Sequence, residues 1–181
     1  GVNSVAEAIG ASVSGQGRIR LGGDIRYELN QRGADGAERA YFKELGTVAE
    51  SADMRSMARL PDGSDQALVE VKAVDGAYPL YGRLGTDPGL SHEQLFGEQN
   101  GAYGAAAPDI LFARLHLKPG DRIHLGKATI ELRARLLDEP DAVSDGFAFA
   151  PRLLISLDAL KASGLVQPGS LVKYIYKVKL P

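Results

Sequence analysis

The sequence predicts an α+β fold in which a ferredoxin-like β-α-β-β…α-β subdomain is interrupted by an inserted small α/β subdomain. Alternating apolar and polar residues mark strands in both halves of the chain, and apolar residues at helical spacing mark the segments between them. A Gly-, Ala- and Pro-rich stretch from Pro79 to about Pro108 separates two such units. The expected division is a helix segment at 1–17, the ferredoxin-like part at 18–81 and 151–181, and the inserted subdomain at 82–150.

The first 17 residues are expected to form a helix over about 3–14, because their apolar residues recur at helical spacing. Glu7 is the only charge in this segment, which favours the continuation of a membrane-spanning helix over a free surface helix. A terminal helix packed on its own domain is an equally weighted alternative. We further expect both termini to lie close together at one end of the molecule.

The first unit reads as strand, helix, strand, strand. The strands are expected near 24–29, 47–60 and 66–74, and the helix ends at Gly46. In the third strand, one face carries Val69, Val71 and Ala73 and the other carries Leu68, Glu70 and Lys72.

The second unit contains a short helix at "SHEQLF", a helix at "APDILFARLHL" and a hairpin that turns at Gly126-Lys127. The second strand of this hairpin is expected to point Ile130, Leu132, Ala134 and Leu136 inward, and Glu131, Arg133 and Arg135 outward. A strand "RLLISL", a helix "LDALKASGL" and a strand at about 171–179 follow. We expect 24–29, 47–60, 66–74 and 171–179 to share one sheet, with 108–137 in a separate small unit.

The composition excludes several classes of function. With 44% apolar residues the 181-residue chain can bury a core, and a net charge of −2 provides no strong field for nucleic acid, which we therefore exclude as a partner. The absence of cysteine removes disulfides, thiolate chemistry and cysteine-based zinc sites.

No catalytic motif stands out, and we expect no cofactor and no metal. His92, His116 and His124 are far apart and fit no metal-binding spacing, and the serines lack a nucleophile elbow. The acidic residues at 138–145, namely Asp138, Glu139, Asp141 and Asp145, lack the spacing of a calcium loop, so a solvated loop is favoured over a cation site.

Two Gly- and Pro-flanked connections carry aromatic or apolar residues that could contact a partner. The first is "GAYPLYG", which leaves the sheet toward the insertion, and the second is "DGFAFAP". The candidate partner-binding residues are Tyr78, Leu80, Tyr81, Phe147 and Phe149. For the tyrosines, packing at the junction between the two subdomains is the favoured alternative.

Several ungapped blocks carry a resemblance to a known family. The chain contains "LGGDIRYEL", "MARLPDGSDQALVEVKAVDGAYPLYGRL", "ILFARLHLKPGDRIHLG" and "PRLLISLDALKASGLVQPGSLVKYIYKVKL". These blocks resemble the large extracytoplasmic domain of FtsX-like, MacB-type ABC transporter permeases, and most of all the YbbP-like branch. The resemblance extends over nearly the whole chain, from Gly15 to Leu180.

The resemblance implies a periplasmic domain inserted between membrane helices, with a porter-like subdomain interrupted by a second one. It implies a second permease copy and a cytoplasmic ATPase subunit as partners, with ATP-driven motion transmitted to the periplasm. It also suggests a periplasmic esterase or lysophospholipase as a partner and lipid-like substrates, and it assigns no catalytic residue. A stand-alone binding or adaptor domain and an unrecognised hydrolase are the alternatives.

Overall fold

The computed structural model describes residues 18–21, 24–139 and 150–181. Its strands are β1 (Arg18–Leu21), β2 (Asp24–Asn30), β3 (Thr47–Arg59), β4 (Gln66–Val74), β5 (Gly85–Asp87), β6 (Glu98–Gln99), β7 (Ala102–Ala107), β8 (Arg122–Leu125), β9 (Ala128–Asp138), β10 (Arg152–Ser156) and β11 (Lys173–Lys179). Its helices are α2 (Gly36–Leu45), α3 (His92–Phe96), α4 (Asp109–Leu115) and α5 (Leu157–Ser163). The helix expected over 3–14 and the position of the N-terminus lie outside the described residues.

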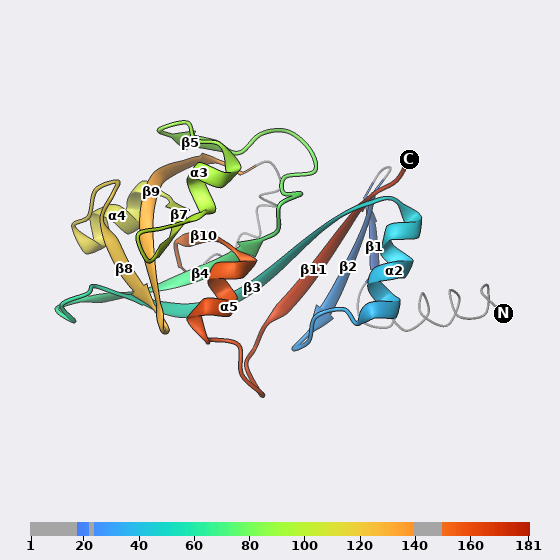
Figure 1. The fold of residues 1–181 in the computed structure, drawn as a ribbon, viewed down its shortest axis with the longest axis horizontal. Helices are drawn as coiled ribbons and strands as arrows, with labels where there is room; N and C mark the ends of the chain where they lie inside the picture. The colour runs from blue at the N-terminus through green and yellow to red at the C-terminus, as the bar shows by residue number, and fades with distance from the viewer. Residues whose placement is uncertain (1–17, 22–23, 140–149) are drawn as a thin grey trace.

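All the described strands belong to one hydrogen-bonded sheet with the order β1-β2-β11-β3-β4-β10-β7-β9-β5. Because β8 pairs with both β9 and β3, the six strands β3, β4, β10, β7, β9 and β8 form a closed ring. The molecule therefore has two lobes that share β3: a barrel lobe, and a sheet lobe made of β1, β2, β11 and α2 (Figure 1).

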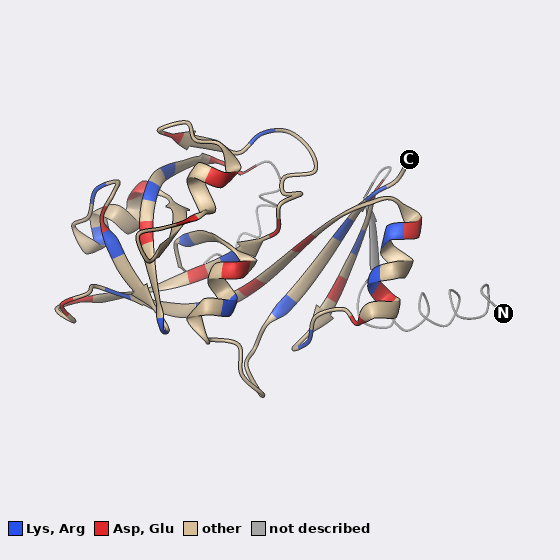
Figure 2. Cartoon of the chain, viewed as in Figure 1, with Lys and Arg blue, Asp and Glu red and all other residues tan. Residues whose placement is uncertain are grey.

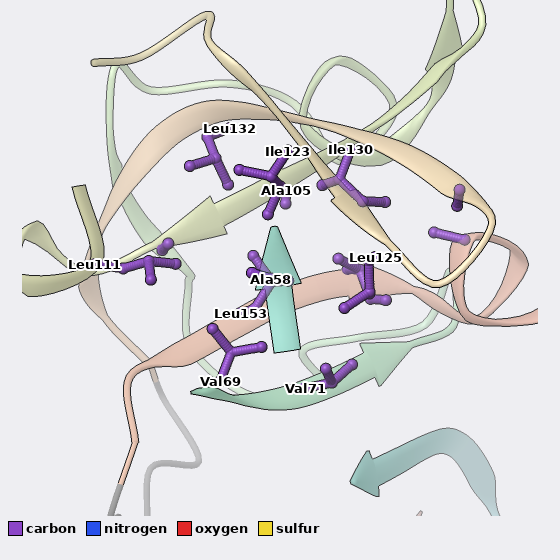
Figure 3. Packing of buried hydrophobic residues seen from close by; sticks show 14 of the residues in the cluster. Ala58, Val69, Val71, Ala105, Leu111, Ile123, Leu125, Ile130, Leu132 and Leu153 are labelled. Carbon is purple, nitrogen blue, oxygen red and sulfur yellow. The ribbon is translucent and has the colours of Figure 1, made fainter. Parts of the chain in front are cut away.

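The barrel lobe is filled with aliphatic side chains. Val69 and Val71 of β4, Ile130 and Leu132 of β9 and Leu153 of β10 are completely buried and converge on the barrel axis (Figure 3). The buried apolar residues of α4 and α5 belong to the same cluster, so both helices cover the barrel. Burial of this apolar surface is the main source of stability for the lobe.

The sheet lobe has its own core beneath α2. This helix begins with a capping box, in which the Asp35 side chain accepts a hydrogen bond from the Glu38 backbone N–H and the Glu38 side chain accepts one from the Asp35 N–H. Its Phe42 ring lies between Tyr27 of β2 and Tyr176 of β11, with ring centroids 4.7 and 5.0 Å away. These aromatic contacts hold α2 on one face of the sheet.

A third apolar cluster lies outside the barrel. It is made of Val74, Tyr78, Leu95, Phe96, Ala106, Ala134 and Leu154. Here α3, whose N-cap Ser91 forms a second capping box with Gln94, covers the outer side of β7, β9 and β10. The chain between β4 and α3 is thereby fixed to the barrel lobe.

The strand-sharing prediction is confirmed, since β2, β11, β3 and β4 are neighbours in one sheet. The separate small unit expected at 108–137 stays a prediction: β8 pairs with β3 and β9 with β7, so this segment shares the sheet, and among the described residues neither strand pairs with β4. Strands on the two sides of the expected boundaries at 82 and 150 are hydrogen bonded to each other. That these boundaries separate units that fold independently stays a prediction.

The α+β class is confirmed, but the ferredoxin-like arrangement is not. The β2-α2-β3 unit is present, with β11 between its two strands. However, α2 and α5 pack against different clusters of buried residues, α2 on the sheet lobe and α5 on the barrel. The physical reason is that β8 closes the barrel. The second half of β3 is then part of the barrel wall, and α5 packs on the barrel core instead of beside α2.

Two local predictions need correction. Arg133 was expected to point outward, but it is 8% exposed and lies where the pairing of β7 with β9 skips one residue between Leu132 and Ala134. Its side chain lies on the outer side of the barrel but is covered by α3, where it donates hydrogen bonds to the carbonyl oxygens of Gln94 and Ala102 at 3.0 and 3.3 Å. The same β-bulge moves Ala134, which was expected inward, into the cluster outside the barrel. Lys72, expected on the polar face of its strand, lies on that face but is only 6% exposed.

Candidate interaction surface

The candidate surface begins where the chain leaves β4 at Asp75. The Asp75 carboxylate accepts a hydrogen bond from the Glu50 backbone N–H at 2.8 Å, and the Asp75 N–H donates to the Glu50 carbonyl oxygen at 3.1 Å. A third bond, from the Ala77 N–H to the Asp75 carboxylate, turns the chain away from the sheet. The start of the connection is thus fastened to β3.

Tyr78 is the buried end of this connection. It is 7% exposed and packs with Val74, Phe96 and Leu154 in the cluster outside the barrel. The Lys72 ammonium lies 5.0 Å from the centroid of the Tyr78 ring, a cation–π contact between two buried side chains. Tyr78 is thus buried at the junction between the connection and the barrel lobe. Its role in partner binding stays a prediction.

Tyr81 is the exposed end, and Leu80 between them is half-buried. Tyr81 is 46% exposed, yet its hydroxyl donates a hydrogen bond to the Asp24 carboxylate and its ring lies 4.8 Å from the Lys179 ammonium. The hydrogen bond to the carboxylate raises the pKa of Tyr81 to about 12, so the hydroxyl remains a donor at neutral pH. Among the three candidates on this connection, Tyr81 offers most surface to a partner.

Phe147 and Phe149 lie outside the described residues, as do Asp141 and Asp145 of the acidic loop. Their suggested roles therefore stay predictions. Of the remaining acidic residues, Asp138 is exposed at the end of β9, and Glu139 pairs with Arg152 at 3.0 Å.

The sheet face next to the connection carries a lattice of charges. Lys173, Asp53 and Lys72 are register neighbours on β11, β3 and β4. In the next row Arg55 bonds to Glu70 at 2.7 Å. Positive and negative residues are interspersed here, and residues of both signs are scattered over the rest of the described chain (Figure 2). The lattice is close to neutral and does not by itself define an anion or cation site.

Asp53 is the unusual member of this lattice. Burial raises the pKa of its carboxyl group, and the nearby charges of Lys72, Arg152, Arg26 and Lys173 offset the rise in part. One of its oxygens, Oδ1, is buried without a hydrogen-bond partner among the described residues. The charge on Asp53 therefore carries a desolvation cost that its neighbours only partly repay.

Sequence reasoning missed the residues that hold the two tyrosines. Asp24 and Lys179 lie at register-paired positions of β2 and β11, more than 50 and almost 100 residues from Tyr81 along the chain. Lys179 lies in a strand that the sequence predicts, but no local signal links it to Tyr81. For Lys72 the one sequence signal of a buried contact was its position in a strongly apolar strand.

The described residues hold no group of three or more His, Cys, Asp or Glu side chains placed to bind a metal ion. His92 is exposed and contacts the Asp75 carbonyl oxygen at 3.1 Å, and His116 ends α4 in a left-handed conformation. In the same described ranges, no helix is long and apolar enough to cross a membrane.

One comparison with known proteins finds a relative among the permeases of ABC transporters. No family model matches the chain. The chain is similar to the uncharacterized ABC transporter permease YbbP of Escherichia coli (strain K12), with 40% identity over 116 residues. The matched region covers 64% of this chain and 13% of YbbP. The resemblance to YbbP-like permeases is thus confirmed, and the chain spans only a small part of the length of this relative.

A search of solved structures also finds a similar chain. It is the crystal structure of a domain of a candidate permease protein from Porphyromonas gingivalis, with a TM-score of 0.49 and 13% sequence identity. The match covers 76% of this chain and 56% of that chain.

Proposed function

We propose that this chain is a periplasmic domain of an FtsX-like, MacB-type ABC transporter permease, and that it transmits ATP-driven conformational change to substrates or partners in the periplasm. The similarity to YbbP over 116 residues carries the proposal. In this role the domain has no catalytic activity, and ATP hydrolysis belongs to a separate cytoplasmic subunit.

Two features of the fold suit a domain that transmits motion. The 13-residue strand β3 runs from the sheet lobe through the wall of the barrel, so both lobes are joined by continuous backbone. At the sheet end, β11 lies between β2 and β3, hydrogen bonded to both along its length. Displacement of β11 would therefore act on both neighbours at once.

The proposed partners are the cytoplasmic ATPase subunit, a second permease copy and a periplasmic esterase or lysophospholipase. Lipid-like compounds are the proposed substrates. The contact surface proposed for a periplasmic partner is the connection around Tyr81, with Leu80 beside it and with Phe147 and Phe149 on the second connection.

A test of location uses the lack of cysteine in this chain. Lys118, which is exposed after α4, is changed to Cys in a full-length permease that carries this domain and has no other cysteine. A membrane-impermeant maleimide should label this variant in intact cells whose outer membrane is permeabilised. Labelling only after the inner membrane is disrupted would refute the periplasmic location.

A test of motion uses the same variant with a spin label, purified with its ATPase subunit in nanodiscs. Two permease copies give one distance between the two labels, and vanadate trapping should shift this distance relative to the nucleotide-free state. A missing dipolar signal would contradict the second copy, and an unchanged distance would contradict transmission of the ATP-driven motion.

A further inference from the structure

The two lobes are packed as separate bodies. The barrel lobe is built around the residues of β4, β9 and β10, whereas the sheet lobe is built around Tyr27, Phe42 and Tyr176. Among the described residues, Tyr174 on β11 packs against both clusters. Because so little apolar packing is shared, the angle between the lobes depends on the backbone of the shared strands and on side-chain contacts that bridge the lobes.

The connection between β4 and β5 provides such a bridge. It starts in the barrel lobe and runs out toward β3 before it returns to β5 (Figure 1). Its root is fixed by the buried ring of Tyr78. Three residues later Tyr81 contacts Asp24 at the start of β2 and Lys179 at the end of β11, both in the sheet lobe.

We propose that Tyr81, Asp24 and Lys179 form a clasp that sets the angle between the two lobes, and that its release allows the barrel lobe to bend about β3. The contact is polar and Tyr81 is 46% exposed, so the clasp adds little to the packed cores. A hydrogen bond of ordinary net strength shifts a two-state ratio by about fivefold. The clasp therefore biases the angle between the lobes and can be opened by a modest load.

The short link between Tyr78 and Tyr81 is what makes the clasp effective. Only Pro79 and Leu80 separate the buried anchor in one lobe from the exposed contact in the other. Movement of Asp24 or Lys179 is consequently transmitted to the barrel lobe without a long flexible segment between them. This inference concerns the isolated chain and does not depend on the proposed transport role.

The experiment measures the distance between the lobes in the 181-residue chain. Spin labels are attached at Glu44→Cys on α2 and Ala113→Cys on α4, which are exposed and lie in different lobes. Because the chain has no native cysteine, only these two positions are labelled. Pulsed dipolar spectroscopy is recorded for this pair alone and with Tyr81→Phe or Asp24→Ala added. Tyr103→Phe, which removes a tyrosine hydroxyl inside the barrel lobe, is the matched control.

With the clasp intact we expect one narrow distance distribution. Tyr81→Phe keeps the ring but removes the hydrogen-bond donor, and Asp24→Ala removes the acceptor, so both should broaden or shift the distribution to a similar extent. The double variant should add nothing further, since both changes remove the same bond. Distributions that coincide with the parent would overturn the proposal, as would an equal change in the Tyr103→Phe control.

Discussion

The hydroxyl group of Tyr176 donates a hydrogen bond to Oε2 of Glu50 at 2.5 Å, which joins β11 to β3 on the side of the sheet that α2 covers. The same hydroxyl accepts a hydrogen bond from the Ala34 N–H at 2.7 Å. Arg39 of α2 completes the group with a bidentate pair to Glu50, at 3.0 and 2.9 Å. Three elements of the sheet lobe therefore meet at one tyrosine hydroxyl.

Loss of this hydroxyl should destabilise the chain. In Tyr176→Phe the buried Ala34 N–H loses its acceptor and Glu50 loses a donor, so we expect the free energy of unfolding to fall by about 1–3 kcal/mol. Urea denaturation followed by circular dichroism measures the change. Tyr103→Phe, on a half-buried tyrosine of the barrel lobe, should lie within about 0.5 kcal/mol of the parent. Equal stability of the two variants would show that the Tyr176 bonds contribute nothing net.

The two tyrosines of the connection should differ in what they do. Tyr78→Ala leaves a cavity in the cluster outside the barrel and should lower the free energy of unfolding by about 3 kcal/mol. Tyr81→Ala should leave the melting temperature nearly unchanged while it weakens function or partner binding in the full permease. A large fall in melting temperature for Tyr81→Ala would show that it belongs to the packing and would remove it from the proposed contact surface.

The sequence predicted best those elements that carry a local pattern. The alternation in "ALVEVKAV" identified β4 and its inward face, and the Gly126-Lys127 turn identified the β8–β9 hairpin. The helix α2 was found from its apolar spacing and from Gly46 at its end. In each case the residues that determine the structure are neighbours along the chain.

The strand β7 was missed because its sequence, "AYGAAA", is rich in Ala and Gly, which have low strand propensity. Small side chains are required there because β7 lies between β9 and β10, with α3 packed on its outer side. The closure of the barrel was missed for a similar reason, since it depends on two residue pairs between β3 and β8, more than 60 residues apart. Such contacts leave no periodic signal in the sequence.

The raised pKa of Asp53 predicts an unusual pH dependence of stability. Because the folded chain binds this proton more tightly than the unfolded chain, the contribution of Asp53 is most favourable below the unfolded pKa and is lost as the pH rises through the folded pKa. Asn at this position imitates the protonated form at every pH. Asp53→Asn should therefore gain stability relative to the parent as the pH rises from about 4 toward 7.

Urea denaturation of both proteins across this pH range provides the measurement. Asp62→Asn is the control, because hydrogen bonds to Ser64 lower the pKa of the exposed Asp62 carboxyl, which gives the opposite sign. A parent that becomes more stable than Asp53→Asn with rising pH would mean that the surrounding cations outweigh the desolvation of Asp53.

The close contact between β7 and α3 yields the last prediction. A Cβ atom placed on Gly104 would lie 1.8 Å from the carbonyl oxygen of Leu95 and 2.5 Å from Nη1 of Arg133. Gly104→Ala must therefore push α3 away from β7 and disturb the hydrogen bonds that Arg133 makes to Gln94 and Ala102. We expect a loss of about 1–3 kcal/mol in the free energy of unfolding, as for other overpacked sites.

Gly89→Ala is the matched control for this substitution, because a Cβ atom on Gly89 meets nothing within 4 Å. Its unfolding free energy should stay close to that of the parent. Hydrogen exchange would locate the damage in Gly104→Ala: amides of α3 and of the preceding connection should lose protection, whereas those of α2, in the other lobe, should keep it. Equal loss of protection in α2 would mean that the two lobes unfold as one unit, and the clasp would then have no separate bodies to join.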